Sequence, residues 1–181
     1  MAMNAVKTDV EVIQQIISED EHFPGNSRLP LTIYRNVIEF GNKDRARLIE
    51  SIFDSNKWKS SWRDSIYRFH HYHSNTHESL GIYRGHANVQ FGGPNGPVFK
   101  VQTGDIILIP AGVAHKNLDS SDDFGVVGAY PNGKSWDMNY GKEDERPDAD
   151  KNINEVPVPE LDPVFGQNKN YLNLREVTYN K

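Results

Sequence analysis

The sequence predicts an all-β domain of the sandwich, jelly-roll or barrel type, and two observations indicate this class. Short segments rich in β-branched and aromatic residues recur between Trp62 and Tyr130. Clusters of Gly, Pro, Asn, Asp and Ser separate these segments and mark turns. Closing such strands into a barrel also removes the unpaired sheet edges that would otherwise pair with other chains.

The first zone of the chain, residues 1–61, is expected to combine a strand with a helix as an N-terminal extension. Residues 29–38 have the β-branched and aromatic content of a strand. Asn42 then stands where a helix N-cap is expected, with Asp44 in the first turn. Apolar residues at helical spacing follow, which predicts one amphipathic helix packed against the outside of a sheet: Ala46, Ile49, Ile52 and Phe53.

The second zone, residues 62–130, is expected to form the barrel core. Its first strand is the alternating stretch from Ile66 to His73. Trp58 and Trp62, close to the start of this zone, are interpreted as core anchors. The remaining expected strands are residues 80–83, 87–91, 98–101, 106–109 and 124–127.

The third zone, residues 131–181, is expected to wrap the barrel as an irregular C-terminal tail, so that residues 1–181 form a single domain. The dense charge run at residues 141–151 is interpreted as a solvated loop. Prolines farther along exclude long regular elements: Pro157, Pro159 and Pro163.

Composition excludes several classes of function. The chain has no cysteine, which rules out disulfides, thiolate zinc sites and cysteine nucleophiles. With 20 basic and 25 acidic residues it carries a net charge of −5, and no basic face stands out for nucleic acid. No apolar run is long enough to span a membrane. The start of the sequence lacks the pattern of a secretory signal, so we expect a cytoplasmic location.

A cluster of metal-ligating residue types lies on the strands of the second zone. In a strand alternate side chains share a face, so His71 and His73 point the same way with Cα atoms about 6.7 Å apart. Two imidazoles at this separation can bind one ion. A turn then brings Glu78 back beside the pair, and His115 follows the turn that ends a strongly apolar strand. These four side chains are the predicted metal ligands.

The spacing of these residues resembles the two motifs of the cupin superfamily. The first motif is Gly, five residues, His-x-His, three or four residues, Glu, six residues, Gly. The second is Gly, five residues, Pro-x-Gly, two residues, His, three residues, Asn. Ser65 replaces the opening glycine and Asp119 the closing asparagine, and neither position is a ligand in the family. The matching residues are His71, His73, Glu78, Gly85, Gly104, Pro110, Gly112 and His115.

The resemblance implies a cupin-type double-stranded β-helix, a jelly-roll barrel. It also implies one divalent metal ion, with Fe, Mn, Ni and Zn all open. The segments Phe91–Pro94 and Val126–Pro131 are similar to a bacterial branch of small single-domain cupins without an assigned reaction. Dimers are common among cupins, and residues 29–40 would supply the intermolecular strand of a homodimer.

Two classes of function follow from the resemblance and stay open. The first is a metal-dependent small-molecule enzyme, dioxygenase-like or isomerase-like. The second is a non-catalytic, metal-anchored binder or sensor of a small metabolite. No general base beyond the ligands stands out in the sequence, so no catalytic residue is assigned.

Strand parity predicts the wall of a pocket around the ion. The candidates are Tyr67, Phe69, Ile106 and Leu108, and such a wall suits a small, partly apolar molecule. His70 has the wrong parity for a ligand. The other histidines outside the motifs are expected to face solvent: His22, His77 and His86.

Overall fold

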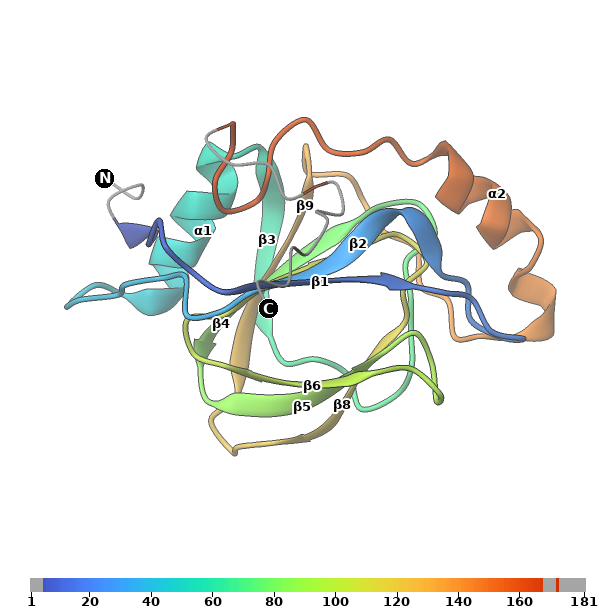
Figure 1. Ribbon diagram of the computed structural model, residues 1–181, viewed down its shortest axis with the longest axis horizontal. Helices are drawn as coiled ribbons and strands as arrows, with labels where there is room; N and C mark the ends of the chain where they lie inside the picture. The colour runs from blue at the N-terminus through green and yellow to red at the C-terminus, as the bar shows by residue number, and fades with distance from the viewer. Residues whose placement is uncertain (1–4, 168–171, 173–181) are drawn as a thin grey trace, which may run out of the picture.

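The computed structural model describes residues 5–167 and 172, and it confirms the predicted all-β class. Two antiparallel sheets face each other to form the jelly roll (Figure 1). The larger sheet has the strand order β1-β2-β7-β4-β9-β3 and the smaller β6-β5-β8. The strands are β1 Val12–Ile17, β2 Asn26–Tyr34, β3 Trp58–Asp64, β4 Glu78–Arg84, β5 His86–Phe91, β6 Val98–Gln102, β7 Ile106–Ile109, β8 His115–Ser120 and β9 Gly125–Pro131.

Helix α1 (Arg45–Ser55) lies against the outside of the larger sheet, as the periodicity of its apolar residues predicts (Figure 1). The N-cap is Asp44, whose side chain accepts a hydrogen bond from the backbone N–H of Arg47, and not the expected Asn42. Asp44 caps the helix because its carboxylate reaches an N–H group that the helix itself leaves without a partner.

The core has two main layers, and β7 separates them. Ile107 and Ile109 pack between the two sheets, whereas Ile106 and Leu108 pack with the residues of α1. All four are buried, so strand β7 is apolar on both faces. The expectation that Ile106 and Leu108 face the barrel interior is therefore wrong, since that interior receives the alternate residues.

Strand β2, which contains the first part of residues 29–40, lies inside the larger sheet. One of its edges pairs with β1 and the other with β7. The pairing with β7 covers residues 32–34, so at these residues β2 has partners within the chain on both sides.

The charged segment after the barrel contains regular structure, contrary to the expected irregular loop. A 3₁₀ turn, η2 (Glu143–Glu145), is followed by helix α2 (Asp148–Glu155). The buried side chains of Ala149 and Ile153 stand one helical turn apart on α2. With so few apolar positions, the helix gives only a weak periodic signal in the sequence.

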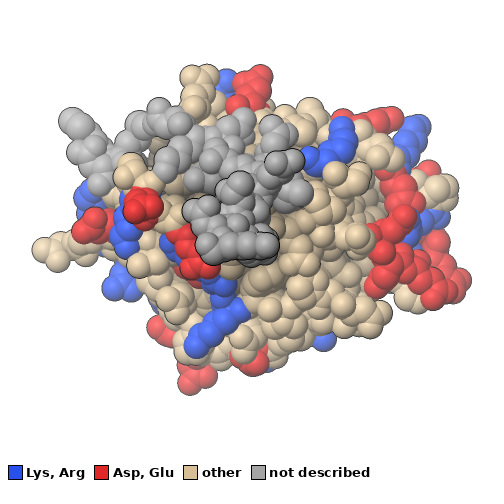
Figure 2. Space-filling view, in the orientation of Figure 1, with Lys and Arg blue, Asp and Glu red and all other residues tan. Residues whose placement is uncertain are grey.

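The surface in Figure 2 carries acidic side chains at the end of the molecule where α2 and η2 lie in Figure 1. Lys and Arg side chains are scattered over the same view. Among the described residues, no helix combines the length and the apolar composition needed to cross a bilayer.

Candidate metal centre

The backbone joins the two histidine-bearing segments directly. His71 and His115 form a two-way antiparallel bridge, in which the N–H of each donates to the carbonyl of the other at 3.3 Å and 2.9 Å. The Gly112 N–H donates to the carbonyl of His73 at 2.8 Å. These bonds place segments more than 30 residues apart in contact, and the rings of His71 and His115 stand 4.1 Å apart, centroid to centroid.

Gly112 holds this junction in a conformation that other residues rarely adopt. Its φ is +89°, and an added Cβ would lie 2.8 Å from the carbonyl oxygen of Gly25 and 2.7 Å from Ile153 Cδ1. We expect Gly112→Ala to lower the free energy of unfolding by about 2–4 kcal/mol, because φ strain and overpacking add. Chemical denaturation measures this.

The matched control is Gly41→Ala. Gly41 also has a positive φ, +54°, but nothing lies within 4 Å of its added Cβ. It should cost only the strain of the backbone conformation, about 1 kcal/mol. Equal losses for the two variants would contradict the role given to Gly112 at the junction.

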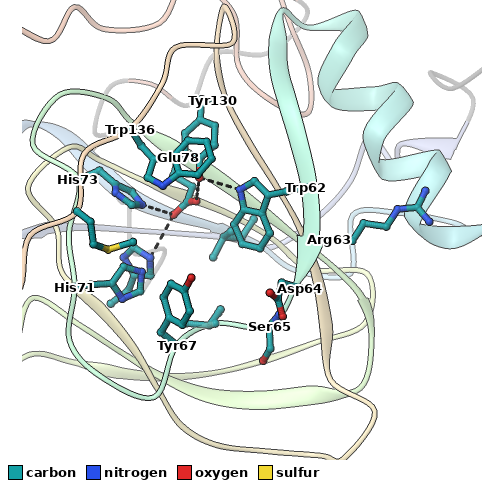
Figure 3. Close-up of a pocket in the computed structure, with 14 residues that line it drawn as sticks. Trp62, Arg63, Asp64, Ser65, Tyr67, His71, His73, Glu78, Tyr130 and Trp136 are labelled. Atoms are coloured by element: carbon teal, nitrogen blue, oxygen red, sulfur yellow. Dashed lines mark hydrogen bonds and ion pairs between the residues drawn. The ribbon is translucent and has the colours of Figure 1, made fainter.

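The structure brings the four predicted ligands together inside the barrel. The ligand atoms of His71, His73 and His115 lie within 4.8 Å of one another, and all three residues are buried. Glu78 Oε2 lies 3.5 Å from His73 Nε2 and 3.3 Å from His115 Nε2. Figure 3 shows the carboxylate turned toward the imidazoles.

Backbone carbonyls set the tautomer of all three imidazoles. A carbonyl oxygen only accepts, so each Nδ1 beside one carries the proton, and each Nε2 keeps its lone pair. This pattern orients metal-binding histidines in proteins. The three pairs are His71 Nδ1 with Phe69 O at 3.2 Å, His73 Nδ1 with Asp137 O at 2.5 Å and His115 Nδ1 with Val113 O at 3.3 Å.

A hydrogen-bonded chain holds Glu78 in place. Trp62 Nε1 donates to the hydroxyl of Tyr130, which in turn donates to Glu78 Oε1, each at 2.8 Å (Figure 3). Burial and the neighbouring carboxylate raise the pKa of Tyr130, so its hydroxyl stays protonated and remains a donor.

The other oxygen of Glu78, Oε2, has no hydrogen-bond partner among the described residues although it is buried. It faces the lone pairs of His73 and His115, and such a set of buried acceptors requires a positive charge at its centre. Three imidazole nitrogens and one carboxylate oxygen are donors that suit a divalent transition metal. These residues therefore fit a metal ion.

The pKa shifts of Glu78 and His73 favour positive charge in this group of side chains, whereas the shift of His71 favours a neutral ring. Burial raises the pKa of Glu78, but its contacts with His115 and His73 outweigh burial and hold it well below the usual range. Burial lowers the pKa of His73, yet Glu78 reverses this and the pKa is raised. For His71, burial and the nearby His115 lower the pKa to about 3, so this ring is neutral at pH 7.

A cavity of about 230 Å³ opens beside these four side chains. Its wall is mainly aromatic and aliphatic, and its lining carries an arginine and an aspartate from the end of β3. The lining residues are Trp62, Arg63, Asp64, Ser65, Ile66, Tyr67, His71, His73, Glu78, Leu80, His115, Tyr130, Trp136 and Met138.

Of the four predicted wall residues, only Tyr67 lines this cavity. Phe69 is half-exposed, and its ring stacks on the ring of Tyr67 with centroids 4.8 Å apart. Ile106 and Leu108 belong to the α1 layer, which excludes them from the wall. Residues 65–69 form an irregular connection rather than the expected strand, so simple alternation does not hold there.

The residues that surround Glu78 were not predicted from the sequence. Tyr130 and Trp62 were not assigned to the site, and neither were Trp136 and Met138. A signal existed for Tyr130: it shares strand parity with Val126, which packs between the two sheets. The two residues from the 134–139 connection carry no periodic signal.

His77 is buried, contrary to the expected solvent-facing position, and it has a structural role. Its Nδ1 accepts from the N–H of Ala111 at 2.8 Å, and its Nε2 donates to the carbonyl of Pro157 at 3.1 Å. His22 and His86 are exposed as expected. His70 lies outside the ligand group and packs against the ring of Phe23.

His77 should make the fold sensitive to acid. Burial lowers its pKa to about 4, below the unfolded value near 6.5, so the unfolded chain binds more protons between these values. Its contribution is complete above about pH 6.5 and falls as the pH drops toward 4. Metal-free wild type should lose free energy of unfolding between pH 7.5 and pH 4.5. We expect this loss to be about 2–3 kcal/mol smaller in His77→Asn. Chemical denaturation at both pH values measures this difference, and His86→Asn is the control. An equal change in unfolding free energy between the two pH values in His77→Asn and wild type would contradict the prediction.

Comparison with known proteins gives one relative by sequence and several by fold. No protein-family model matches the chain. The uncharacterised protein YjlB of Bacillus subtilis (strain 168) is 42% identical over 156 residues, which is 86% of this chain and 92% of YjlB. A DUF861 family protein from Thermotoga maritima superposes with a TM-score of 0.31 and 20% identity, over 55% of this chain and 96% of that one. Acireductone dioxygenase from Bacillus anthracis, with a cadmium ion in its active centre, superposes with a TM-score of 0.39 and 17% identity. The match covers 72% of this chain and 83% of the dioxygenase.

Proposed function

Since the chain belongs to the family of YjlB and carries both cupin-like motifs, we propose that it is a cupin-type, metal-dependent enzyme acting on a small molecule. The observation that carries the proposal is the convergence of three Nε2 lone pairs and one carboxylate oxygen that has no hydrogen-bond partner among the described residues, all beside a cavity. The reaction is of the dioxygenase or isomerase type.

The ligands would be His71, His73, His115 and Glu78. A divalent ion on this set, when bound, would polarise an oxygen-bearing substrate or activate oxygen. Four protein ligands leave positions open in a six-coordinate ion, which distinguishes a reactive site from a closed structural one.

The protein's own residues orient the candidate ligands and form the wall of the cavity beside them. The backbone carbonyls fix the three rings, and Tyr130 fixes the carboxylate. Trp62 and Trp136 line the cavity beside Glu78 and give it an aromatic wall.

Elemental analysis of protein purified without added metal tests the proposal. The expected result is about one transition-metal ion per chain. Protein that contains no metal and binds none on addition of iron, manganese, nickel or zinc would refute it. If iron is found, oxygen uptake with candidate substrates is the next measurement.

A second reading, a metal-anchored binder or sensor, rests on the lining of the cavity. Beyond the four candidate ligands and Asp64, the described part of the lining offers no carboxylate or imidazole as a general base. The two readings differ in substrate turnover: an enzyme converts a bound small molecule, and a binder releases it unchanged.

The Tyr130→Phe variant tests whether the hydrogen bond from Tyr130 orients Glu78 for metal binding. The substitution removes the hydroxyl that donates to Oε1 and keeps the ring. We expect metal affinity to fall about 10–100-fold, the usual effect of losing a partner that orients a ligand. A competition titration with a chelating dye measures it. Tyr140→Phe, at a half-exposed tyrosine outside the lining, is the control, and equal affinities in all three proteins would contradict the assignment.

A further inference from the structure

The side chains that line the cavity define the kind of ligand it accepts. On the segment that follows β9, alternate side chains diverge: Trp136 and Met138 line the cavity, and Asp137 between them turns to the other side. The carboxylate of Asp137 accepts from the backbone N–H of Ser74 at 2.7 Å and from its hydroxyl at 2.5 Å. Its carbonyl accepts from His73. The segment is therefore tied to the ligand group at the residue between its two apolar side chains.

Trp136 forms a flat surface at this wall. Its ring stacks on that of Tyr130 with centroids 4.6 Å apart and an interplanar angle of 13°, and it remains 44% exposed. Trp62 stands on another side of the cavity, with its ring nitrogen bonded to Tyr130 (Figure 3). Aromatic surfaces of this kind favour flat ligands, which stack against them.

The volume of the cavity limits the size of the ligand. At about 230 Å³ it is smaller than the pockets of roughly 300–1,000 Å³ that hold drug-sized molecules. A dry cavity of about 150 Å³ is enough for benzene. The cavity thus has room for one six-membered ring with one or two small substituents.

The charges in the lining limit the charge of the ligand. Arg63 is the one Lys or Arg in the described lining, and Glu50 binds its guanidinium through two bonds of 2.7 Å and 2.8 Å. In Figure 3 this side chain points away from the cavity, toward α1. Asp64 adds a negative charge to the same lining. A divalent ion on Glu78 leaves one net positive charge, so a second negative charge on the ligand would have no cationic partner.

We propose that the cavity binds a flat, ring-sized ligand with an apolar body and an oxygen-bearing edge, carrying at most one negative charge. This inference rests on the proposed function, since the oxygen edge would meet the metal ion. Trp136 is the residue that selects the flat body, and the neutralised Arg63 is the reason that small dianions are rejected.

The test compares two probes of similar size on zinc-loaded protein: catechol, which is flat and neutral, and malonate, a flexible dianion. Tryptophan fluorescence and calorimetry measure binding, and elemental analysis measures zinc per chain. We expect catechol to bind at least tenfold more tightly than malonate. Trp136→Ala should weaken catechol binding about tenfold with zinc content unchanged, and Trp136→Phe, which keeps a stacking ring, should restore most of it. Leu118→Ala, at an exposed apolar residue of β8, is the control.

The outcomes separate the two proposals. Malonate binding as tightly as catechol, unchanged catechol affinity in Trp136→Ala, or one zinc per chain without catechol binding would each overturn the ligand inference and leave the metal centre intact. Failure of the wild-type chain to hold zinc would overturn the metal centre and the ligand inference together.

Discussion

Replacing His115 by alanine is expected to abolish stoichiometric metal binding while leaving a folded barrel. His115 supplies one of the three Nε2 atoms, and its ring lies against that of His71, so its loss opens the ligand set on one side. Removing a supporting residue of a metal ligand costs 10–100-fold in affinity, and we expect removal of the ligand itself to cost more than about a hundredfold. Dialysis followed by elemental analysis measures the occupancy.

Two controls accompany this variant. His86→Ala removes an exposed imidazole outside the ligand group and should keep full occupancy. Circular dichroism and thermal unfolding should show that His115→Ala remains folded, because its backbone bridge to His71 does not depend on the side chain. A folded His115→Ala protein with wild-type metal content would exclude His115 as a ligand.

Replacing Glu78 by glutamine is expected to change metal affinity and metal-free stability in opposite directions. In the metal-free protein the buried Oε2 faces two acceptor nitrogens without a hydrogen bond. A glutamine amide can donate to one of them, and we expect the free energy of unfolding at pH 8 to rise by about 1–3 kcal/mol. Metal affinity should fall by more than about a hundredfold, since the amide carries no negative charge.

Higher metal-free stability together with lower metal affinity in Glu78→Gln distinguishes a metal centre from a structural ion pair. If Glu78 served only to pair with His73 and His115, its neutralisation would destabilise the protein with or without metal. Denaturation of the metal-free and metal-loaded forms of both proteins separates the cases. A Glu78→Gln variant that is less stable than wild type in both forms would contradict the account.

The four candidate ligands could be proposed from the sequence because the spacing of these residues along the chain depends on local geometry. His71 and His73 share a side of an extended segment, and both His115 and Glu78 follow turns that the sequence marks with Gly, Pro or Asn. The fold class followed from short strands and regular turn signals. Strand β3 was not predicted because it is a polar edge strand, paired only with β9, and lacks apolar alternation.

The wall of the cavity could not be predicted in the same way. Strand β7 consists of four buried apolar residues, so its sequence does not tell which face is inside, and the packing of α1 on one face decides it. Trp136 and Met138 reach the cavity because Asp137 ties their segment to Ser74, more than 60 residues earlier in the chain. Contacts of this range depend on the folded topology.

The most direct test of the metal centre is anomalous X-ray diffraction from crystals of the metal-loaded protein, collected on both sides of the absorption edge of the metal. We expect one peak per chain, at about 2.0–2.3 Å from Nε2 of His71, His73 and His115 and from the carboxylate of Glu78. A peak elsewhere on the chain, or a loaded crystal with no peak among these four side chains, would contradict it.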